Sequence, residues 1–185
     1  MTHGADHGKR FAEALDGAFV ALAGLKAQGV VGAIGVGVNE VAVCLETLAR
    51  VDLDVILLAG RYTLLDPSAA AVLLPLCRAR GVRVIVGGPY NSGVLAGGAH
   101  YDYTAASPAV LERARRLRHA CAAHGVALEA AALHYPLRHP AVACVIPGAR
   151  SAQEVTANLG HFANPPPETL WASLAARGLI PDGSA

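Results

Sequence analysis

Three residues near the end of the chain have types and spacing suited to binding an anion. Arg150, Ser151 and Glu154 follow a short apolar run at 142–146 that a Pro-Gly pair ends. The S-x-x-E spacing is that of a capping box, which begins a helix. The free N–H groups of a first helical turn, the positive end of its dipole and an arginine together favour a phosphate. An ordinary capped helix with a surface arginine explains the same residues without a ligand, because capping boxes are common.

The composition bounds what such a site can belong to. The chain has 185 residues, of which 54% are hydrophobic and 16% charged, so we expect a single domain, 1–185, with a well-packed core. No apolar run approaches the roughly 18 residues of a membrane span, which favours a soluble protein that does not bind membranes. The net charge is +1, and the four arginines at 113–118 face away from an apolar helical stripe. Nucleic acid is therefore not an expected partner.

Cysteine and histidine placement gives no sign of a metal or disulfide framework. The four cysteines are far apart, with no C-x-x-C pair, and no secretory leader precedes them, so we expect reduced thiols and a cytoplasmic protein. His3 and His7 are four residues apart but have no third ligand nearby. We therefore expect no metal site.

Buried apolar runs alternate with helical patterns along the chain, as in parallel β/α units. Helix 39–50 is expected to begin with Asn39 as its N-cap, and the helix opened by Asp66 and Pro67 to bend at Pro75. A long glycine-rich loop, 87–106, is expected after the third strand. The expected strands are 30–38, 54–58, 82–86 and 142–146, and the other expected helices are 10–28, 108–124, 127–137, 151–161 and 166–177.

Two architectures accommodate four parallel strands with right-handed crossovers. An open doubly wound sheet normally carries G-x-G-x-x-G after its first strand, but Gly32, Gly35 and Gly37 have the wrong spacing. We therefore favour an α/β fold that is an incomplete (β/α)8 TIM barrel with about four strands. Its two outer strands would have unpaired edges, which favours self-association.

Four stretches together resemble the C-terminal half of the aldo-keto reductase family. They are GVGVNE at 35–40, LLAGRYTLLD at 57–66, GGPYNSGVL at 87–95 and HPAVACVIPGAR at 139–150. The resemblance covers nearly the whole chain and is closest to the branch that includes D-threo-aldose 1-dehydrogenase and L-fucose dehydrogenase. It implies the second half of a barrel, with a nicotinamide dinucleotide and a small sugar at the carboxyl ends of the strands.

The resemblance also implies which residues hold the cofactor. Asn39 would lie near the nicotinamide carboxamide, and Tyr90 would stand in for the family's stacking aromatic, which Gly87 replaces. The family's loop over the pyrophosphate and its adenosine end imply the remaining cofactor residues, namely Gly88, Asn91, Ser92, Gly93, Leu95, Gly148, Ala149, Arg150, Glu154 and Asn158. A carboxylate at Glu154 would repel a 2′-phosphate and accept a ribose hydroxyl, which favours NAD, although Arg150 leaves NADP open.

The family's catalytic Asp, Tyr, Lys and His are carried on the first four strands, and the resemblance implies that this chain has none of them. Its two lysines, Lys9 and Lys26, do not follow a strand. Weaker substrate candidates are Tyr62, Tyr101 and Tyr103. We expect an aldose dehydrogenase that oxidises C1 of the sugar to a lactone, with the isolated chain inactive.

Two other classes of function stay open at this point. One is a nucleotide-binding or self-associating half-barrel module without catalysis. The other is a barrel lyase or aldolase with a phosphate site at the last strand, although the lack of a strand-end lysine excludes its Schiff-base form.

Overall fold

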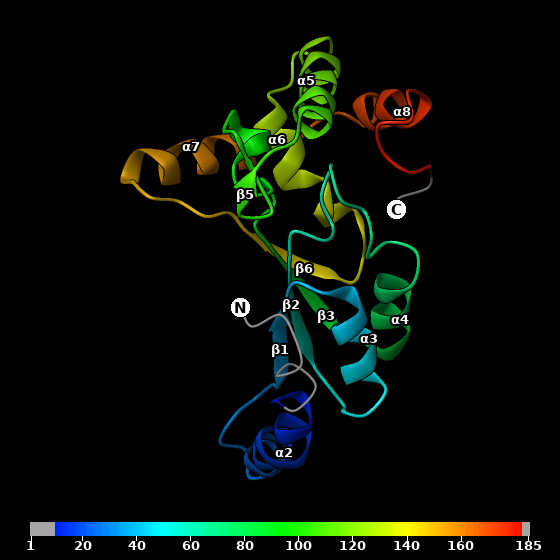
Figure 1. Cartoon of the computed structure of the whole chain (residues 1–185), viewed down its shortest axis with the longest axis vertical. Coiled ribbons are helices and arrows are strands. Elements are labelled where there is room, and N and C mark those ends of the chain that lie inside the picture. The colour runs from blue at the N-terminus through cyan, green and yellow to red at the C-terminus, as the bar shows by residue number, and fades with distance from the viewer. Residues whose placement is uncertain (1–9, 183–185) are drawn as a thin grey trace.

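A parallel sheet of four strands forms the centre of the molecule (Figure 1). The computed structural model describes residues 10–182. The strands are β1 (Gly35–Val38), β2 (Val55–Ala59), β3 (Arg83–Gly87) and β6 (Val142–Ile146), in the order β1-β2-β3-β6. Every neighbouring pair is parallel. The predicted partial barrel of four parallel strands is therefore confirmed.

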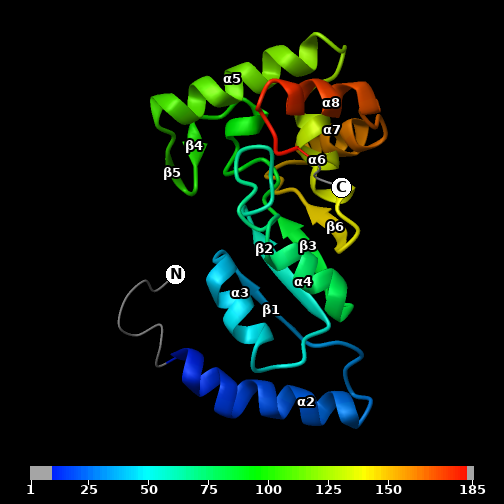
Figure 2. The same cartoon turned by 90° about the vertical axis from the view of Figure 1, so that its right-hand side faces the viewer.

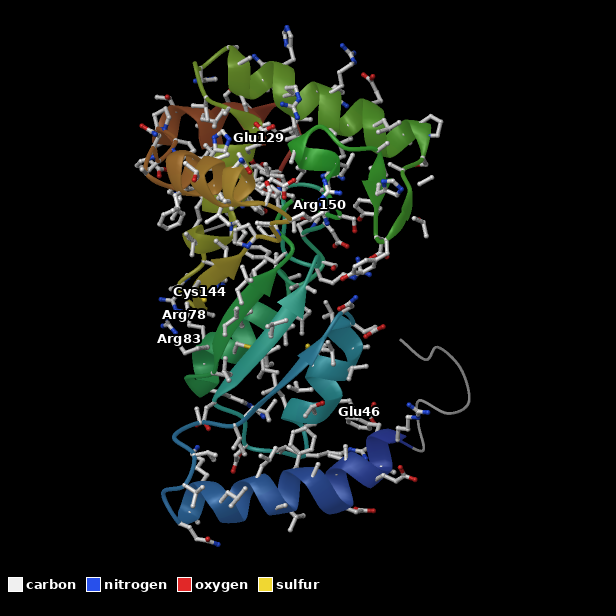
Figure 3. The ribbon with its side chains drawn as sticks, turned by 90° about the vertical axis from the view of Figure 1, so that its left-hand side faces the viewer. Glu46, Arg78, Arg83, Glu129, Cys144 and Arg150 are labelled. Atoms are coloured by element: carbon white, nitrogen blue, oxygen red, sulfur yellow. The ribbon has the colours of Figure 1, made fainter. Side chains whose placement is uncertain are left out.

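The two faces of this sheet differ in cover. Helices α3 (Val41–Leu48) and α4 (Leu73–Arg80) pack on one face (Figure 1). Figure 3 looks onto the opposite face, where the strands lie in front of these helices. The residues Leu57, Cys144 and Ile146 are exposed there, and strand register places all three on this face. Side chains along a strand point alternately to the two faces of a sheet, so every second residue lies on this uncovered face.

Most of the other helices gather beyond the strands' carboxyl ends, toward which the arrowheads in Figure 3 point. They are α5 (Pro108–Ala122), α6 (Leu128–His134), the 3-10 turn η3 (Pro136–Arg138), α7 (Ala152–Phe162) and α8 (Glu168–Ala176). At the other end of the molecule lie the π-helical turn η1 (Ala14–Ala18) and α2 (Phe19–Ala27) (Figure 2). No helix within residues 10–182 is long and apolar enough to cross a membrane.

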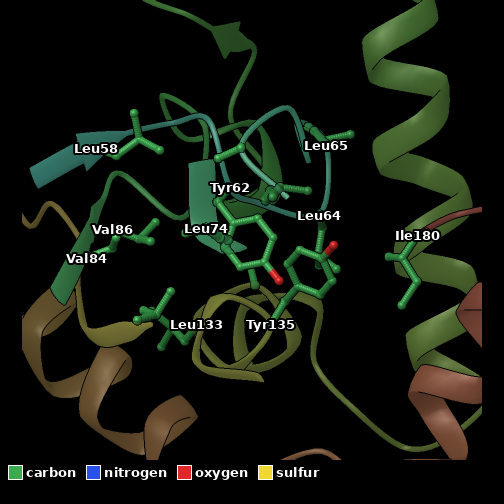
Figure 4. Packing of buried hydrophobic residues seen from close by; sticks show 14 of the residues in the cluster. Leu58, Tyr62, Leu64, Leu65, Leu74, Val84, Val86, Leu133, Tyr135 and Ile180 are labelled. Atoms are coloured by element: carbon green, nitrogen blue, oxygen red, sulfur yellow. The ribbon is translucent and has the colours of Figure 1, made fainter. Parts of the chain in front are cut away.

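A cluster of large side chains packs between the sheet and the helices beyond its carboxyl end (Figure 4). Tyr62 and Tyr135 are fully buried, with ring centroids 5.3 Å apart, and Trp171 lies 6.2 Å beyond Tyr135. Leu58 and Leu133 pack into the same cluster. Burial of these side chains supplies the apolar free energy that stabilises this part of the fold.

The first strand is shorter than predicted. Instead of 30–38 it spans Gly35–Val38, because Val30 N donates to Leu25 O and so closes the preceding helix. A Cβ at Gly35 would lie 2.1 Å from Val55 O, so only glycine allows this close approach of the two strands. The helix that follows has Glu40, not Asn39, at its N-cap. Asn39 thus belongs to the turn after the strand.

Two further expectations were wrong. The helix predicted from Asp66 begins at Leu73, so Pro75 lies in its first turn, where the missing N–H costs no helical hydrogen bond. Residues 67–72 form turns instead, in which Ala70 N donates to Pro67 O, and Ala69 N donates back to Arg61 O. The predicted loop 87–106 contains a 3-10 turn, η2 (Val94–Ala96), and a short antiparallel hairpin, β4 (His100–Tyr101) and β5 (Thr104–Ala105).

Candidate functional site

A cavity of about 830 Å³ lies at the carboxyl ends of β2, β3 and β6. Backbone hydrogen bonds join these ends, from Gly60 N to Gly87 O at 3.0 Å and from Gly88 N to Ile146 O at 3.1 Å. The cavity is lined by ten of the twelve predicted cofactor residues, which are Gly88, Tyr90, Asn91, Ser92, Gly93, Gly148, Ala149, Arg150, Glu154 and Asn158. Folding therefore brings together segments that are about 60 residues apart in the sequence.

Tyr90 docks the loop after β3 onto helix α7. Its hydroxyl donates to Asn158 Oδ1 at 2.7 Å, and its side chain is largely buried. Burial, and to a lesser extent the nearby carboxylate of Glu129, raises the pKa of Tyr90 to about 12. The phenol is therefore neutral near pH 7 and acts as a hydrogen-bond donor to α7.

Asn91 carries an unpaired acceptor at the cavity wall. Its backbone is left-handed, with φ of 47°, and its Nδ2 donates to Gly60 O at 3.2 Å. The residue is 4% exposed, and its Oδ1 has no hydrogen-bond partner among the described residues. A buried acceptor without a donor is costly, so this oxygen fits a ligand that brings an N–H or O–H group. An amide or ribose hydroxyl of a dinucleotide would supply one.

The helix start predicted from the S-x-x-E spacing is confirmed at Ser151, but only one of the two hydrogen bonds of a capping box is present. Ser151 Oγ accepts from Glu154 N at 3.2 Å, whereas a carboxylate oxygen of Glu154 accepts from Arg150 N, one residue before the N-cap, at 2.6 Å. The Arg150 guanidinium is 92% exposed, with one weak contact to Glu154 at 3.5 Å. The helix thus begins at the cavity with its positive end, and Arg150 has the reach to meet an anion there.

The hairpin β4–β5, which lies beside the start of α5 (Figure 2), forms another wall of the cavity. Its tip consists of Asp102 and Tyr103, which both have positive φ, and both line the cavity. Tyr103 N donates to Ser92 Oγ at 2.9 Å, so the tip is attached to the loop after β3. Ser92 is itself left-handed, with φ of 59°. Non-glycine residues in this conformation cluster at functional sites, where surrounding contacts hold them.

Arg61, directly after β2 and Gly60, ties three segments together. Its Nε donates to Asn39 O at 2.8 Å, Nη1 donates to Asp66 at 3.3 Å, and Nη2 lies 3.0 Å from both carboxylate oxygens of Asp102. Burial opposes the charge, but the carboxylates of Asp102 and Asp66 hold the pKa of Arg61 above its ordinary value. The guanidinium thus stays charged at the rim of the sheet.

Four of the predicted site residues do not line the cavity. Leu95 and Tyr62 are fully buried, and Tyr62 packs against Tyr135 and His139. Asn39 lies at the end of β1, held through its carbonyl by Arg61. Tyr101 is partly buried against the core, and burial raises its pKa. We therefore leave Tyr62 and Tyr101 out of the proposed substrate contacts and retain Tyr103.

Sequence reasoning missed several residues that line the cavity, among them Gly60, His100, Glu129 and His161. The sequence could have indicated Gly60, because this residue directly follows the second strand and barrel sites form where strands end. His161 lies three residues after Asn158, on the same face of α7. Glu129 begins a different helix, and no local pattern indicates it.

No group of three or more metal-ligating side chains occurs among the described residues. His3 and His7, which were considered as ligands, lie outside residues 10–182. The groups around the cavity are backbone amides, hydroxyls, amide side chains and the exposed Arg150, together with three carboxylates and two imidazoles. The carboxylates belong to Asp102, Glu129 and Glu154, so an anionic group is favoured only beside Arg150 and the amino end of α7.

Comparison with known proteins gives one family. The model of the "Aldo/keto reductase family" matches residues 6–176. Pyridoxal 4-dehydrogenase of Microbacterium luteolum is 39% identical over 168 residues, covering 89% of this chain and 49% of that protein. D-threo-aldose 1-dehydrogenase of a Pseudomonas species is 36% identical over 173 residues, covering 91% of this chain and 53% of that protein. The chain thus spans about half the length of these relatives.

The fold comparison agrees with the sequence comparison. The holo form of an aldo-keto reductase from Bacillus halodurans superposes with a TM-score of 0.70 at 27% identity. The match covers 90% of this chain and 56% of the other. The four-stranded sheet therefore corresponds to part of that larger structure.

Proposed function

Because the chain belongs to the aldo/keto reductase family, we propose that it is the dinucleotide-binding half of an NAD(P)-dependent oxidoreductase. One observation carries the proposal, namely the cavity where the loops after β2 and β3, the hairpin β4–β5 and the start of α7 converge. Ligands of barrel enzymes bind at this end of the strands. We propose that residues 1–185 act as one domain in this role.

The lining supports a dinucleotide more than a smaller ligand. A volume of about 830 Å³ is near the upper end of the usual range of roughly 300–1,000 Å³ for small-molecule sites. Arg150 and the amino end of α7 are suited to a phosphate, and the unpaired Oδ1 of Asn91 is suited to an amide or hydroxyl donor. These features lie on one connected surface.

NAD is the form we propose. Glu154 has its carboxylate beside the start of α7, where it also accepts from Arg150 N. A 2′-phosphate brought to this place would meet a like charge, whereas a ribose hydroxyl would meet an acceptor. The exposed Arg150 could pair with a 2′-phosphate, so NADP would still bind, but more weakly than NAD.

The substrate we propose is an aldose, as in the relative from Pseudomonas, with its anomeric carbon oxidised to a lactone. The dinucleotide, which Asn91, Arg150 and the amino end of α7 would hold, would supply the hydride acceptor for C1, and the hydroxyl proton would pass to a base. Tyr103, 65% exposed at the hairpin tip, is the retained candidate for contact with the sugar. Location in the cytoplasm remains part of the proposal.

The chain alone should hold the cofactor without turning over substrate. Lys26 pairs with Asp54 at 2.5 Å, at the amino end of β2 and therefore opposite the cavity. A lysine there cannot lower the pKa of a tyrosine at the carboxyl ends, so within residues 10–182 no lysine activates a tyrosine of the cavity for general acid catalysis. The groups for proton transfer would come from the half of the relatives that this chain does not match.

A binding measurement with matched variants of α7 tests the proposal. Ala157 lines the cavity, whereas Thr156 is exposed on the same helix outside the lining and beyond its first turn, so Ala157→Phe fills the site and Thr156→Phe is its control. We expect Ala157→Phe, but not the control, to weaken the affinity for NADH, measured by calorimetry, by roughly tenfold or more. Absence of NADH binding by the unmodified chain refutes the proposal, and NADH production from NAD and an aldose by this chain alone refutes its catalytic part.

A second candidate is a half-barrel that associates with another copy of itself. The exposed side chains Leu57 and Ile146 lie on the uncovered sheet face, and Val155, Leu159 and Phe162 are exposed along α7. Contiguous exposed apolar surface and open strand edges favour association. Light scattering of the purified chain separates the cases, because a discrete dimer supports this candidate and a monomer contradicts it.

A further inference from the structure

The most connected side chain near the cavity belongs to a residue outside its lining. Arg61 is 22% exposed and reaches Asn39, Asp66 and Asp102 through three nitrogen atoms. Asn39 follows β1, and Asp102 is 41 residues further along, at the hairpin tip. One guanidinium thus joins the turn after β1 to the hairpin tip that lines the cavity.

The hairpin tip needs such a contact because its backbone is unfavourable. Asp102 has φ of 50° and Tyr103 has φ of 66°, as a two-residue turn with both positions left-handed requires. This turn favours Asn, Asp or Gly at its first position and Gly at its second, so Tyr103 is the unfavourable residue of the tip. The paired strands β4 and β5 are only two residues long each, so their own hydrogen bonds give little support. External contacts from Arg61 and Ser92 therefore hold the tip.

The residue type fits this task. A guanidinium has five N–H donors in a rigid plane, which can serve several acceptors in fixed directions at once. A lysine at this position would carry the same charge but could not keep all three acceptors in place. The backbone of Arg61 is fixed as well, because its carbonyl accepts from Ala69 N at 3.0 Å.

We propose that Arg61 is a positioning residue of the dinucleotide site, which holds the Asn39 carbonyl and the Asp102–Tyr103 tip together. The link to dinucleotide binding rests on the proposed function, whereas the hydrogen bonds of Arg61 do not depend on it. Through Asn39 the guanidinium fixes the turn after β1, which lies outside the cavity lining but which the family resemblance puts near the nicotinamide, and through Asp102 it fixes a wall of the cavity. Loss of Arg61 therefore affects both parts, whereas loss of the Asp102 charge affects only the wall.

Hydrogen exchange of the ligand-free chain tests the positioning directly. In Arg61→Met we expect amide exchange at 99–106 and at 38–41 to rise roughly tenfold or more, since these segments lose charge-assisted hydrogen bonds. In Asp102→Asn only 99–106 should change. Arg115→Met is the control, because Arg115 pairs with Glu112 on the exposed face of α5. Unchanged exchange at both segments in Arg61→Met overturns the inference.

Two ligands then connect the geometry to binding. ADP-ribose lacks the nicotinamide, so Arg61→Met should weaken NADH more than ADP-ribose, by roughly a further threefold to tenfold, while Asp102→Asn weakens both alike. Arg61→Lys should give intermediate affinity. Full affinity in Arg61→Lys overturns positioning, because charge alone would then suffice. If the unmodified chain bound neither ligand, the proposed function would fail, and the exchange data would still decide the role of Arg61.

Discussion

Glu154 offers the sharpest test of which dinucleotide this site takes. Its carboxylate accepts from Arg150 N, and in the proposed NAD site it would lie close to a 2′-phosphate. Glu154→Gln removes the charge but keeps the side-chain length and an amide oxygen able to accept from Arg150 N. The change therefore isolates electrostatics from helix structure.

The magnitude follows from the exposure of the carboxylate. Glu154 is 42% exposed, so the dielectric constant near it is close to that of water. A unit charge and a 2′-phosphate of about two charges at roughly 5 Å repel by about 1.5 kcal/mol in water. Screening at physiological salt reduces this to about 1 kcal/mol, which is about a fivefold change in affinity. We expect Glu154→Gln to improve NADPH binding about fivefold relative to NADH.

The assay is a pair of calorimetric titrations, with NADPH and with NADH, at low and at physiological salt. Ser151→Ala is the matched control, since it removes the N-cap hydrogen bond from Glu154 N and keeps the charge. It should lower the free energy of unfolding by about 1 kcal/mol without moving the affinity ratio. An unchanged NADPH to NADH ratio in Glu154→Gln, or an equal change in Ser151→Ala, refutes the electrostatic reasoning.

Three further outcomes concern stability. Tyr90→Phe removes the 2.7 Å hydrogen bond to Asn158 and should lower the free energy of unfolding by about 1 kcal/mol in urea titrations; no change would mean the loop does not depend on this bond. Burial lowers the pKa of His139 below its ordinary 6.5, so the unfolded chain binds the proton more tightly. Stability should thus fall as pH drops below about 6.5, and His139→Asn should flatten this dependence in urea titrations at several pH values. Leu58→Ala should cost about 3 kcal/mol by thermal or urea unfolding, because Leu58 is fully buried, whereas exposed Leu57→Ala in the same strand should cost about 1 kcal/mol or less; equal costs would contradict the two-faced sheet.

The sequence was a good guide wherever the signal was local. Four β-branched runs predicted the parallel strands, and the S-x-x-E spacing predicted the helix start at Ser151, since both patterns reflect neighbours along the chain. Local signals misled around Asp66, where an Asp-Pro pair typical of a helix start is followed by turns instead. The backbone of residues 67–72 bonds back to Arg61 and Pro67, which no periodicity reveals.

What the chain determined by itself was therefore the set of parallel β/α units, the family and most of the residues around the cavity. Tertiary structure alone decided that Tyr62 lies in the core, that Tyr90 bonds to a helix 68 residues away, and that Arg61 joins two distant turns. The physical reason is the distance along the chain over which each interaction acts. Hydrophobic period and capping act over a few residues, whereas a buried ring or a guanidinium finds its partners only when segments far apart in sequence have packed together.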